Sequence, residues 1–335
     1  TLIYYIGTYG LSYLTIIFFS LPVIFFFNNY RIKIIVLILC FLFVIITIIL
    51  IFNRQSEIFL KKNLLNVTLI QLNLPSNQKL NLNDLQNKHN NILEKINTNN
   101  SDIIIFGEND YPYLMNENNI KLIQKNIKQN KNLIIGSTRK ESNKFYNSLF
   151  LINEKNYKKF DKKILVPFGE FIPFRALFNF MEFIVGTVDF SVGNEDRKLK
   201  LNNDLSILPV ICYEIIYFWK LLNINNQDTD IIINITNDSW FGEFSGPYQH
   251  LYFTKLRAAE FNKPIIRVSS NGISAIIDNY GNMIESTKLN KREVINTVIK
   301  INTDKQNHLK KHKIILITFF ILLIFGIIMA RYEKR

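Results

Sequence analysis

The sequence predicts a layered α/β domain that is tethered to a membrane by apolar helices on both sides. Two observations lead to this prediction. Between residues 56 and 310 the chain alternates short apolar runs with polar, amphipathic stretches, which is the rhythm of α/β proteins and not of a β-sandwich or a helix bundle. Nearly all of the charge lies in that region, whereas the flanking regions contain long apolar segments without charge.

Three apolar segments are expected to cross a bilayer, because they have sufficient length and show no polar face. They cover about residues 4–27, 34–52 and 314–330. The expected organisation is therefore two membrane helices in residues 1–55, a globular domain in 56–310, and a third helix with a short basic tail in 311–335. The chain starts at Thr1, directly in an apolar segment, so further helices are expected ahead of it.

The charge of the chain limits its partners. The formal net charge of +13 comes from lysines scattered among asparagine and isoleucine. A nucleic-acid site needs a basic stripe with aromatic residues, and no such clustering is present, so we expect no nucleic-acid partner. Anionic phospholipid headgroups suit this charge better. Basic residues flank the apolar segments on both sides, so charge counting leaves the side of the membrane open.

Eight apolar runs are expected to form strands and three amphipathic stretches to form helices. The strands cover 66–74, 102–108, 132–139, 148–153, 206–213, 230–237, 264–270 and 274–281, and the helices cover 82–99, 117–129 and 250–262. Several strands end in a polar or reactive residue: Glu108, Cys212, Asn237 and Asp238. Strand ends that lead into loops are where α/β domains place their chemistry.

Cys212 is the only cysteine of the soluble region, since Cys40 lies in an apolar segment. A buried hydrophobe is the commonest fate of a free cysteine, and this reading needs no function. One thiol cannot form a disulfide within the domain. The four histidines show no metal-ligand spacing, and no glycine-rich phosphate loop is present. We therefore expect no metal site.

Glu108, Lys162 and Cys212 together would supply a complete nucleophilic site. A thiol that attacks a carbonyl carbon needs a base to remove its proton and a donor to stabilise the oxyanion. A carboxylate and a lysine provide both functions. Each residue alone needs no function: the glutamate could be exposed, the lysine solvated and the cysteine part of the core.

The strings around these residues point to one family. In this order and context, the three residues resemble the Glu-Lys-Cys triad of the nitrilase superfamily. The resemblance narrows to the apolipoprotein N-acyltransferases on four strings: LVPFGEFIPF (165–174), ICYEIIY (211–217), NITNDSWFG (234–242) and PYQHLYFTKLRAAEFNKPIIRVSSNGISAIIDNYG (247–281). It implies a nitrilase-like α-β-β-α sandwich tethered by the membrane helices.

The resemblance also implies the reaction and its place. The enzyme would move an acyl chain from a phospholipid to the α-amine of the N-terminal diacylglyceryl-cysteine of an apolipoprotein, the last step of bacterial lipoprotein maturation. It would need no cofactor. It would be a multi-pass protein of the bacterial inner membrane, surrounded by membrane lipids, with the catalytic domain on the periplasmic side. The sequence leaves the oligomeric state open.

The triad roles follow from the resemblance. Cys212 would be the nucleophile that carries the acyl group as a thioester, and Glu108 the general base. Lys162 would stabilise the oxyanion, together with a backbone N–H after Cys212. The adjacent Lys163 is a rival for that role. Lys162 is chosen because the family places its lysine eight positions before the glutamate of PFGE, which is Glu170 here.

Four further residues are implied to support the site. Glu170 would position the lysine and the base, and Tyr213 and Glu214 would shape the pocket and orient the substrate. Asn147, in the string YNS, matches the same family.

The chain departs from the family pattern at three positions. Leu80 stands where a tryptophan is usual, Gly107 replaces a proline, and Ile164 replaces a histidine. None of these changes removes a triad member.

The segment 167–186 contains six phenylalanines beside Glu170. It could be an ordinary core segment, or a lid that dips into the bilayer and guides acyl chains towards the cysteine. Residues 215–222 could form a second such arm. The residues expected to contact lipid or substrate are Phe178, Phe180, Phe183, Trp219 and Trp240.

Two other functions remain open. A membrane-tethered amidase or nitrilase could use the same triad on a soluble substrate, and would then admit water to the thioester. A scaffold without catalysis is the third reading, but it leaves the intact triad unexplained.

Overall fold

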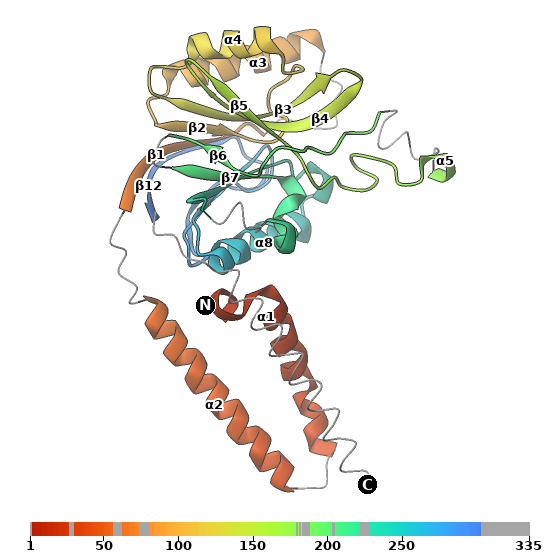
Figure 1. The fold of residues 1–335 in the computed structure, drawn as a ribbon, viewed down its shortest axis with the longest axis vertical. Helices are drawn as coiled ribbons and strands as arrows, with labels where there is room; N and C mark the ends of the chain where they lie inside the picture. The colour runs from red at the N-terminus through yellow and green to blue at the C-terminus, as the bar shows by residue number, and fades with distance from the viewer. Residues whose placement is uncertain are drawn as a thin grey trace. The chain divides into compact units, whose positions relative to one another are not determined.

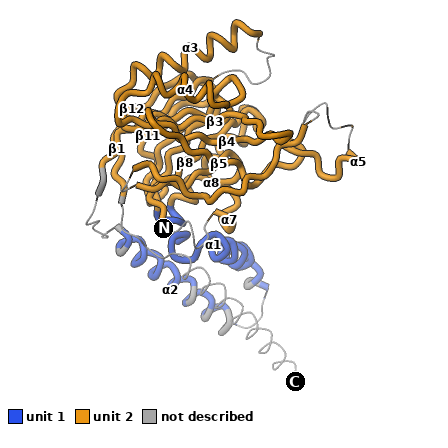
Figure 2. The backbone as a smooth tube through the Cα atoms, turned by 45° about the horizontal axis from the view of Figure 1, so that its top comes forward, with its two compact units in different colours: residues 1–60, 259–262, 306–335 blue, residues 61–258, 263–305 orange. Residues whose placement is uncertain are grey.

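The computed structural model describes residues 2–26, 30–55, 62–73, 81–178, 180, 182, 188–202, 205–221 and 228–302. The apolar segment expected at 314–330, Leu80 and Phe183 lie outside the described residues. The chain divides into two compact units (Figure 2): one contains residues 1–60, 259–262 and 306–335, and the other contains Lys61–Ala258 and Lys263–Lys305.

The described part of the smaller unit is helical. It contains α1 (Leu2–Ser20), the 3-10 helix η1 (Leu21–Phe26) and α2 (Tyr30–Gln55). Within the described residues, one helix is long and apolar enough to cross a membrane, Leu2–Val23, and the shorter apolar stretch Val36–Phe52 lies in α2. Gly7 interrupts the helical geometry with a φ of 65°. The freed N–H of Thr8 donates to the Glu260 carboxylate at 2.7 Å.

The larger unit is built on two six-stranded sheets (Figure 1). The first sheet has the order β12-β1-β2-β3-β4-β5: β1 (Lys62–Gln71), β2 (Ile103–Phe106), β3 (Asn132–Glu141), β4 (Lys144–Asn153), β5 (Tyr157–Asp161) and β12 (Glu293–Asn302). The second has the order β11-β10-β9-β8-β7-β6: β6 (Leu199–Lys200), β7 (Ser206–Ile211), β8 (Ile231–Thr236), β9 (Ile265–Ser269), β10 (Ala275–Ile277) and β11 (Met283–Ser286).

The two sheets pack face to face over one core. Their central strands are parallel (β1-β2-β3 in the first sheet and β7-β8-β9 in the second), and the flanking pairs are antiparallel. Strands such as Ile231–Thr236 are buried along their whole length, which explains their near-continuous isoleucine runs. One core cluster joins side chains from both sheets, for example Leu69 and Ile105 from the first and Ile207 and Ile233 from the second.

Helices cover the outer faces of the sheets. The helices α3 (Leu82–Thr98) and α4 (Glu117–Asn126) pack on the first sheet through a second apolar cluster that includes Ile92 and Ile123. Helix α8 (Ser245–Phe261) lies against the second sheet, where Thr254 accepts a hydrogen bond from Arg267 of β9. Within the described part of the chain, further short helices are α5 (Arg175–Phe178), η3 (Cys212–Ile216), α7 (Phe218–Leu221) and η5 (Ser239–Phe241). The α/β fold expected from the sequence is confirmed.

Four strands were not predicted: β5, β6, β11 and β12. All four are edge strands of the two sheets, where one side of the strand has no partner and the sequence can be polar. β5 has the sequence YKKFD, and its two lysines interrupt the apolar run by which a strand is recognised. β12 alternates buried and exposed positions, with Ile295 and Ile299 in the core and Val294 and Val298 outside.

Candidate active site

Glu108, Lys162 and Cys212 meet at one end of the sandwich. Glu108 follows β2, Lys162 directly follows β5, and Cys212 directly follows β7. β2 and β7 each pair in parallel within their own sheets, so their carboxyl ends open onto loops, as in other α/β sites. All three side chains line a pocket of about 440 Å³, together with Asn109, Asn147, Val166, Pro167, Phe168, Gly169, Glu170, Phe190, Tyr213, Asn237, Trp240 and Phe241. Lys163 does not line this pocket.

Asn147 and Lys162 hold the two carboxylates of the pocket together. Lys162 Nζ lies 2.9 Å from each oxygen of Glu170 and 3.6 Å from Glu108 Oε1. Asn147 Nδ2 donates to Glu108 Oε1 at 2.7 Å and to Glu170 Oε1 at 2.9 Å. The second oxygen of Glu108 accepts the backbone N–H of Asn237 at 2.8 Å. Glu108 is therefore fixed from both sides and buried.

Burial sets the protonation of the triad. It raises the pKa of Glu108 above its ordinary value, and the charge of Glu170 raises it further while Lys162 opposes both. Burial and then the charge of Glu108 raise the pKa of the Cys212 thiol to about 12. Burial lowers the pKa of Lys162, but the charges of Glu108, Cys212 and Glu170 outweigh it and raise that pKa overall. At neutral pH the thiol is thus protonated, the lysine is charged, and a base is needed to start the reaction.

Cys212 has an unusual backbone conformation. Its φ is +54°, in the left-handed region that residues with a Cβ rarely adopt. Such a conformation costs about 1–3 kcal/mol and persists only where the surroundings enforce it. Against the effects of burial and of the Glu108 charge, Lys162 and the Thr236 hydroxyl lower the pKa of the thiol. Cys212 also belongs to the core cluster between the sheets, so it is both a core residue and part of the pocket.

Glu214 differs from the sequence-based expectation. It is fully buried and does not line the pocket, so it does not contact a substrate there. Its carboxylate accepts the backbone N–H groups of Lys163, Ile164 and Ile211 at 2.9–3.1 Å. The first two belong to the loop after Lys162, and the third precedes Cys212. Glu214 therefore ties the lysine loop to the cysteine turn.

Arg197 neutralises Glu214, and sequence reasoning missed it. Its guanidinium donates to both carboxylate oxygens, at 2.7 and 2.8 Å, and to the Pro209 carbonyl at 3.0 Å. Burial raises the pKa of Glu214, but the charge of Arg197 outweighs it and keeps that pKa below its ordinary value. No local sequence signal marks Arg197, since 17 residues separate it from its partner.

The aromatic residues expected to contact lipid lie at different distances from the catalytic groups. Trp240 lines the pocket and is 68% exposed, and Tyr213 forms part of the same wall. Phe178 does not line the pocket, but it stacks edge-on against Phe168, which does, with 5.8 Å between the ring centroids. The ring centroid of Phe180 lies 6.2 Å from that of Phe178.

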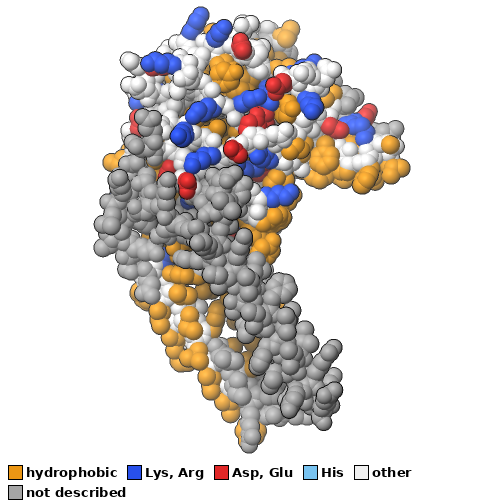
Figure 3. Space-filling model, viewed as in Figure 1, with side chains coloured by type: hydrophobic (Ala, Val, Ile, Leu, Met, Phe, Trp, Pro, Cys, Tyr) orange, Lys and Arg blue, Asp and Glu red, His pale blue; other side chains and the backbone are white. Residues whose placement is uncertain are grey.

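Exposed apolar side chains gather on the segment that carries α5 (Figure 3). They are Phe174, Leu177 and Phe180, the last being 63% exposed. Trp219 is 51% exposed and is joined to the pocket wall through Tyr217, which contacts Tyr213. The core reading of this segment does not fit the exposures of its described residues.

Gly107 allows the close approach of two loops beside Glu108. A Cβ at this position would lie 2.6 Å from Ser270 Oγ and 2.7 Å from the Ser270 backbone nitrogen. The Gly107 N–H also donates to Asp110 at 2.6 Å. The close contacts around position 107 thus suit glycine and not the proline that is usual in the family.

The site offers no cluster of metal ligands. Among the described residues, no group of three or more His, Cys, Asp or Glu side chains could hold a metal ion. The groups able to act on a substrate are the thiol, the two carboxylates and the ammonium. This set suits acyl transfer through a thioester.

Comparisons with known proteins agree with this site. Curated relatives named "Apolipoprotein N-acyltransferase" come from Rickettsia typhi, at 35% identity over 255 residues, and from Allorhizobium ampelinum, at 32% over 226 residues. The matches cover 70% and 63% of this chain, and 49% and 42% of the relatives. The chain thus spans about half the length of the curated relatives it matches.

Solved structures support the fold. A CN-hydrolase superfamily protein from Xanthomonas campestris aligns with a TM-score of 0.53 and 16% identity, covering 71% of this chain and 91% of its own. A member of the nitrilase superfamily from Saccharomyces cerevisiae aligns with a TM-score of 0.52 and 18% identity, covering 72% and 92%. The family model of the carbon-nitrogen hydrolases matches residues 66–308. The chain therefore belongs to the carbon-nitrogen hydrolase family.

Proposed function

We propose that this protein is an N-acyltransferase that moves an acyl chain from a phospholipid, through a Cys212 thioester, to the N-terminal α-amine of a diacylglyceryl-apolipoprotein. The observation that carries the proposal is the meeting of Glu108, Lys162 and Cys212 in a pocket with aromatic walls. The names of the curated relatives favour acyl transfer over hydrolysis.

The first half-reaction forms the thioester. Glu108 takes the proton of the Cys212 thiol, and the sulfur attacks the ester carbonyl of the phospholipid. The Lys162 ammonium and a backbone N–H after Cys212 stabilise the oxyanion. Collapse of the tetrahedral intermediate breaks the ester C–O bond, and the departing alcohol of the lysophospholipid takes the proton back from Glu108.

The second half-reaction consumes the thioester. The lysophospholipid leaves, and the acceptor amine attacks the thioester carbonyl while Glu108 removes one amine proton. Collapse forms the amide and expels the thiolate, which regains its proton from Glu108. Water must stay out of the pocket during this interval, because hydrolysis would waste the thioester.

We also propose the setting of the reaction. The protein would be a multi-pass protein of the bacterial inner membrane, with its catalytic domain on the periplasmic side and membrane lipids around its apolar segments. The apolar helix Leu2–Val23 and the exposed aromatics near the pocket support contact with lipid.

A mass measurement tests the function. Purified protein incubated with phospholipid is expected to gain one acyl group on Cys212, which intact mass and peptide mapping detect. The adduct should persist in water and disappear when a lipopeptide with a diacylglyceryl-cysteine amine is added. The Cys212→Ala variant serves as the control without an adduct. Rapid loss of the adduct to water would instead indicate a hydrolase, and an adduct on another residue would refute the assignment.

The segment of residues 167–186, here called the arm, is expected to deliver the acyl chain. Changing Phe178 and Phe180 to Ser should lower the rate of acylation from phospholipid vesicles at least roughly tenfold, because burial of even one Phe side chain contributes about 1.5–3 kcal/mol. Acylation by a short, water-soluble ester should keep its rate. The measurement is the rate of adduct formation with each donor.

The matched control is Tyr157→Ser, which removes an exposed aromatic residue from β5, outside the arm. It should leave both rates unchanged. Equal rates for the arm variant and the wild type on vesicles would refute a role in lipid delivery.

A further inference from the structure

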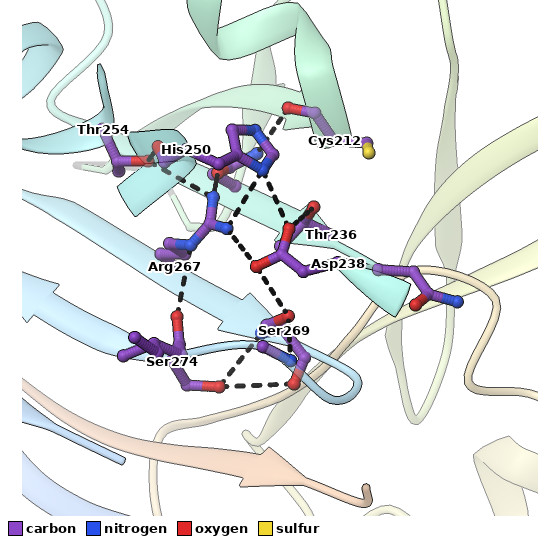
Figure 4. A network of polar contacts seen from close by, with 12 residues as sticks. Cys212, Thr236, Asp238, His250, Thr254, Arg267, Ser269 and Ser274 are labelled. Atoms are coloured by element: carbon purple, nitrogen blue, oxygen red, sulfur yellow. Dashed lines mark hydrogen bonds and ion pairs between the residues drawn. The ribbon is translucent and has the colours of Figure 1, made fainter. Parts of the chain in front are cut away.

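A buried polar network lies beneath the nucleophile and has no role in the proton transfers described above (Figure 4). Its central residue is Arg267 of β9, which is fully buried and whose guanidinium donates in three directions. Nη2 donates to Asp238 Oδ2 at 2.6 Å, Nη1 donates to Asn234 Oδ1 at 2.9 Å, and Nε donates to the Ile273 carbonyl at 3.2 Å.

Asp238 neutralises this buried cation. Its pKa is raised by burial, but the charge of Arg267 outweighs that effect and keeps it well below its ordinary value. The other carboxylate oxygen lies 2.8 Å from His250 Nδ1 and accepts the Thr236 hydroxyl at 3.2 Å. Since an ionised carboxylate can only accept, His250 Nδ1 carries a proton.

The network reaches Cys212 at its backbone and at its thiol. Asn234 Nδ2 donates to the Cys212 carbonyl at 3.4 Å and to the Val210 carbonyl at 3.3 Å. The Thr236 hydroxyl, which donates to Asp238, lowers the pKa of the thiol against the effect of burial. Figure 4 shows the Cys212 carbonyl oxygen on the side of His250 and the sulfur on the opposite side.

The network also supports the wall of the pocket. The His250 ring lies 5.9 Å from the Tyr213 ring and 5.3 Å from the Phe241 ring, measured between centroids. Both aromatic residues line the pocket. The turn at Gly272 packs tightly on the other side, where a Cβ would lie 2.0 Å from Asp238 Oδ2. Asp238 therefore has little freedom to move.

We propose that Asn234, Asp238, His250 and Arg267 form a positioning brace that holds Cys212 in its left-handed conformation and aims the thiol at Glu108 and the substrate. The strained backbone of Cys212 needs surroundings that enforce it. Strand pairing places these groups side by side, because Val210, Asn234 and Arg267 are direct neighbours across β7, β8 and β9. The ion pair of Arg267 and Asp238 fixes the orientation of the Asn234 amide, and that amide holds the cysteine carbonyl. The proposal concerns positioning for the thioester chemistry proposed above.

The test compares two variants that each remove one acceptor from the same guanidinium nitrogen. Asn234→Leu removes the acceptor of Nη1 and the donor to the Cys212 carbonyl. Thr254→Val removes the other acceptor of Nη1, at 3.3 Å, but no contact with Cys212. A purely structural role predicts similar effects from both changes, whereas a brace predicts that only Asn234→Leu affects the thiol.

The first readout is the rate at which iodoacetamide alkylates Cys212 in the full-length protein in detergent. Mass spectrometry of the peptides measures this rate and distinguishes alkylation of Cys212 from that of Cys40. Asn234→Leu should lower this rate on the order of tenfold, since small misplacements of reacting atoms have effects of that size or more. It should lower kcat by a similar factor while KM for phospholipid stays unchanged. Cys212 in the Thr254→Val variant should be alkylated at the wild-type rate, even if the melting temperature of this variant falls as far as that of Asn234→Leu.

Two further results decide the proposal. Arg267→Lys keeps the buried positive charge but loses the forked guanidinium that joins Asn234 to Asp238, so it too should slow alkylation. This variant decides the question if Asn234→Leu does not fold. Wild-type alkylation rates in both Asn234→Leu and Arg267→Lys would overturn the brace. Alkylation does not depend on acyl transfer. If the wild type alkylates at Cys212 but forms no thioester with phospholipid, the proposed function fails while the brace is still tested.

Discussion

Glu108→Gln is expected to slow thioester formation by about 10²–10⁴-fold, the usual contribution of a positioned general base. The pKa of the Cys212 thiol is raised to about 12, so almost no thiolate exists at neutral pH without a base. Glutamine preserves the size of the side chain, but its single oxygen can accept only one of the hydrogen bonds that the two Glu108 oxygens accept from Asn147 and Asn237. The pH dependence of the rate is therefore needed to separate the missing base from the missing hydrogen bond. The measurement is the single-turnover rate of adduct formation.

The pH dependence of that rate separates the base from a structural role. Because the pKa of Glu108 is raised, wild-type activity should fall on the acid side at a higher pH than an ordinary glutamate would give, as the base becomes protonated. The Gln variant should lose this acid limb. Its residual rate should rise with pH as the thiol ionises, at a lower pH than in the wild type, because the charge of Glu108 helps to raise the thiol pKa.

Glu117→Gln, an exposed change in the first turn of α4, is the matched control and should keep the wild-type rate. A Glu108→Gln variant with a wild-type profile would show that another group removes the proton.

Arg197→Met is expected to lower the free energy of unfolding by about 3–5 kcal/mol, because it leaves the Glu214 carboxylate buried without its partner. Both members of the pair are almost inaccessible to solvent. Chemical denaturation followed by circular dichroism measures the loss. The control is Lys131→Met, which breaks a partly exposed pair with Asp102 and should change stability far less.

A double variant distinguishes the two tasks of Glu214. Arg197→Met combined with Glu214→Leu removes both charges and should recover much of the lost stability. It should not recover activity, because the N–H groups of Lys163, Ile164 and Ile211 lose their shared acceptor. Recovery of both stability and activity would mean that the pair does not position the lysine and cysteine loops.

The sequence marked two members of the triad, Glu108 and Cys212, because each stands at the end of a predicted strand. Apolar runs such as Ile103–Phe106 and Ser206–Ile211 are easily recognised as strands, and the reactive residue after each is then conspicuous. The position of Lys162 depended on a motif, since its own strand β5 is short and polar.

The groups that support the triad could not be found in this way. Arg197 and Glu214 are 17 residues apart, and Arg267 and Asp238 are 29 residues apart, so only the fold brings them together. Asp238, His250 and Arg267 stand in strings that resemble the family, but nothing in a linear string says that they contact one another. The resemblance to the family implies that Glu214 shapes the pocket and orients the substrate. The turn of η3 points it inwards instead.

The close contact at Gly107 has a consequence for how this sequence can change. Positions 107 and 270 are not independent, because any side chain at 107 would meet Ser270 Oγ at 2.6 Å and its backbone nitrogen at 2.7 Å. A proline at 107 would also lose the N–H that Asp110 accepts. Relatives with proline before the catalytic glutamate should therefore carry a different residue or a shifted backbone at the position of Ser270. The two positions should vary together, and restoring the proline here would require a second change.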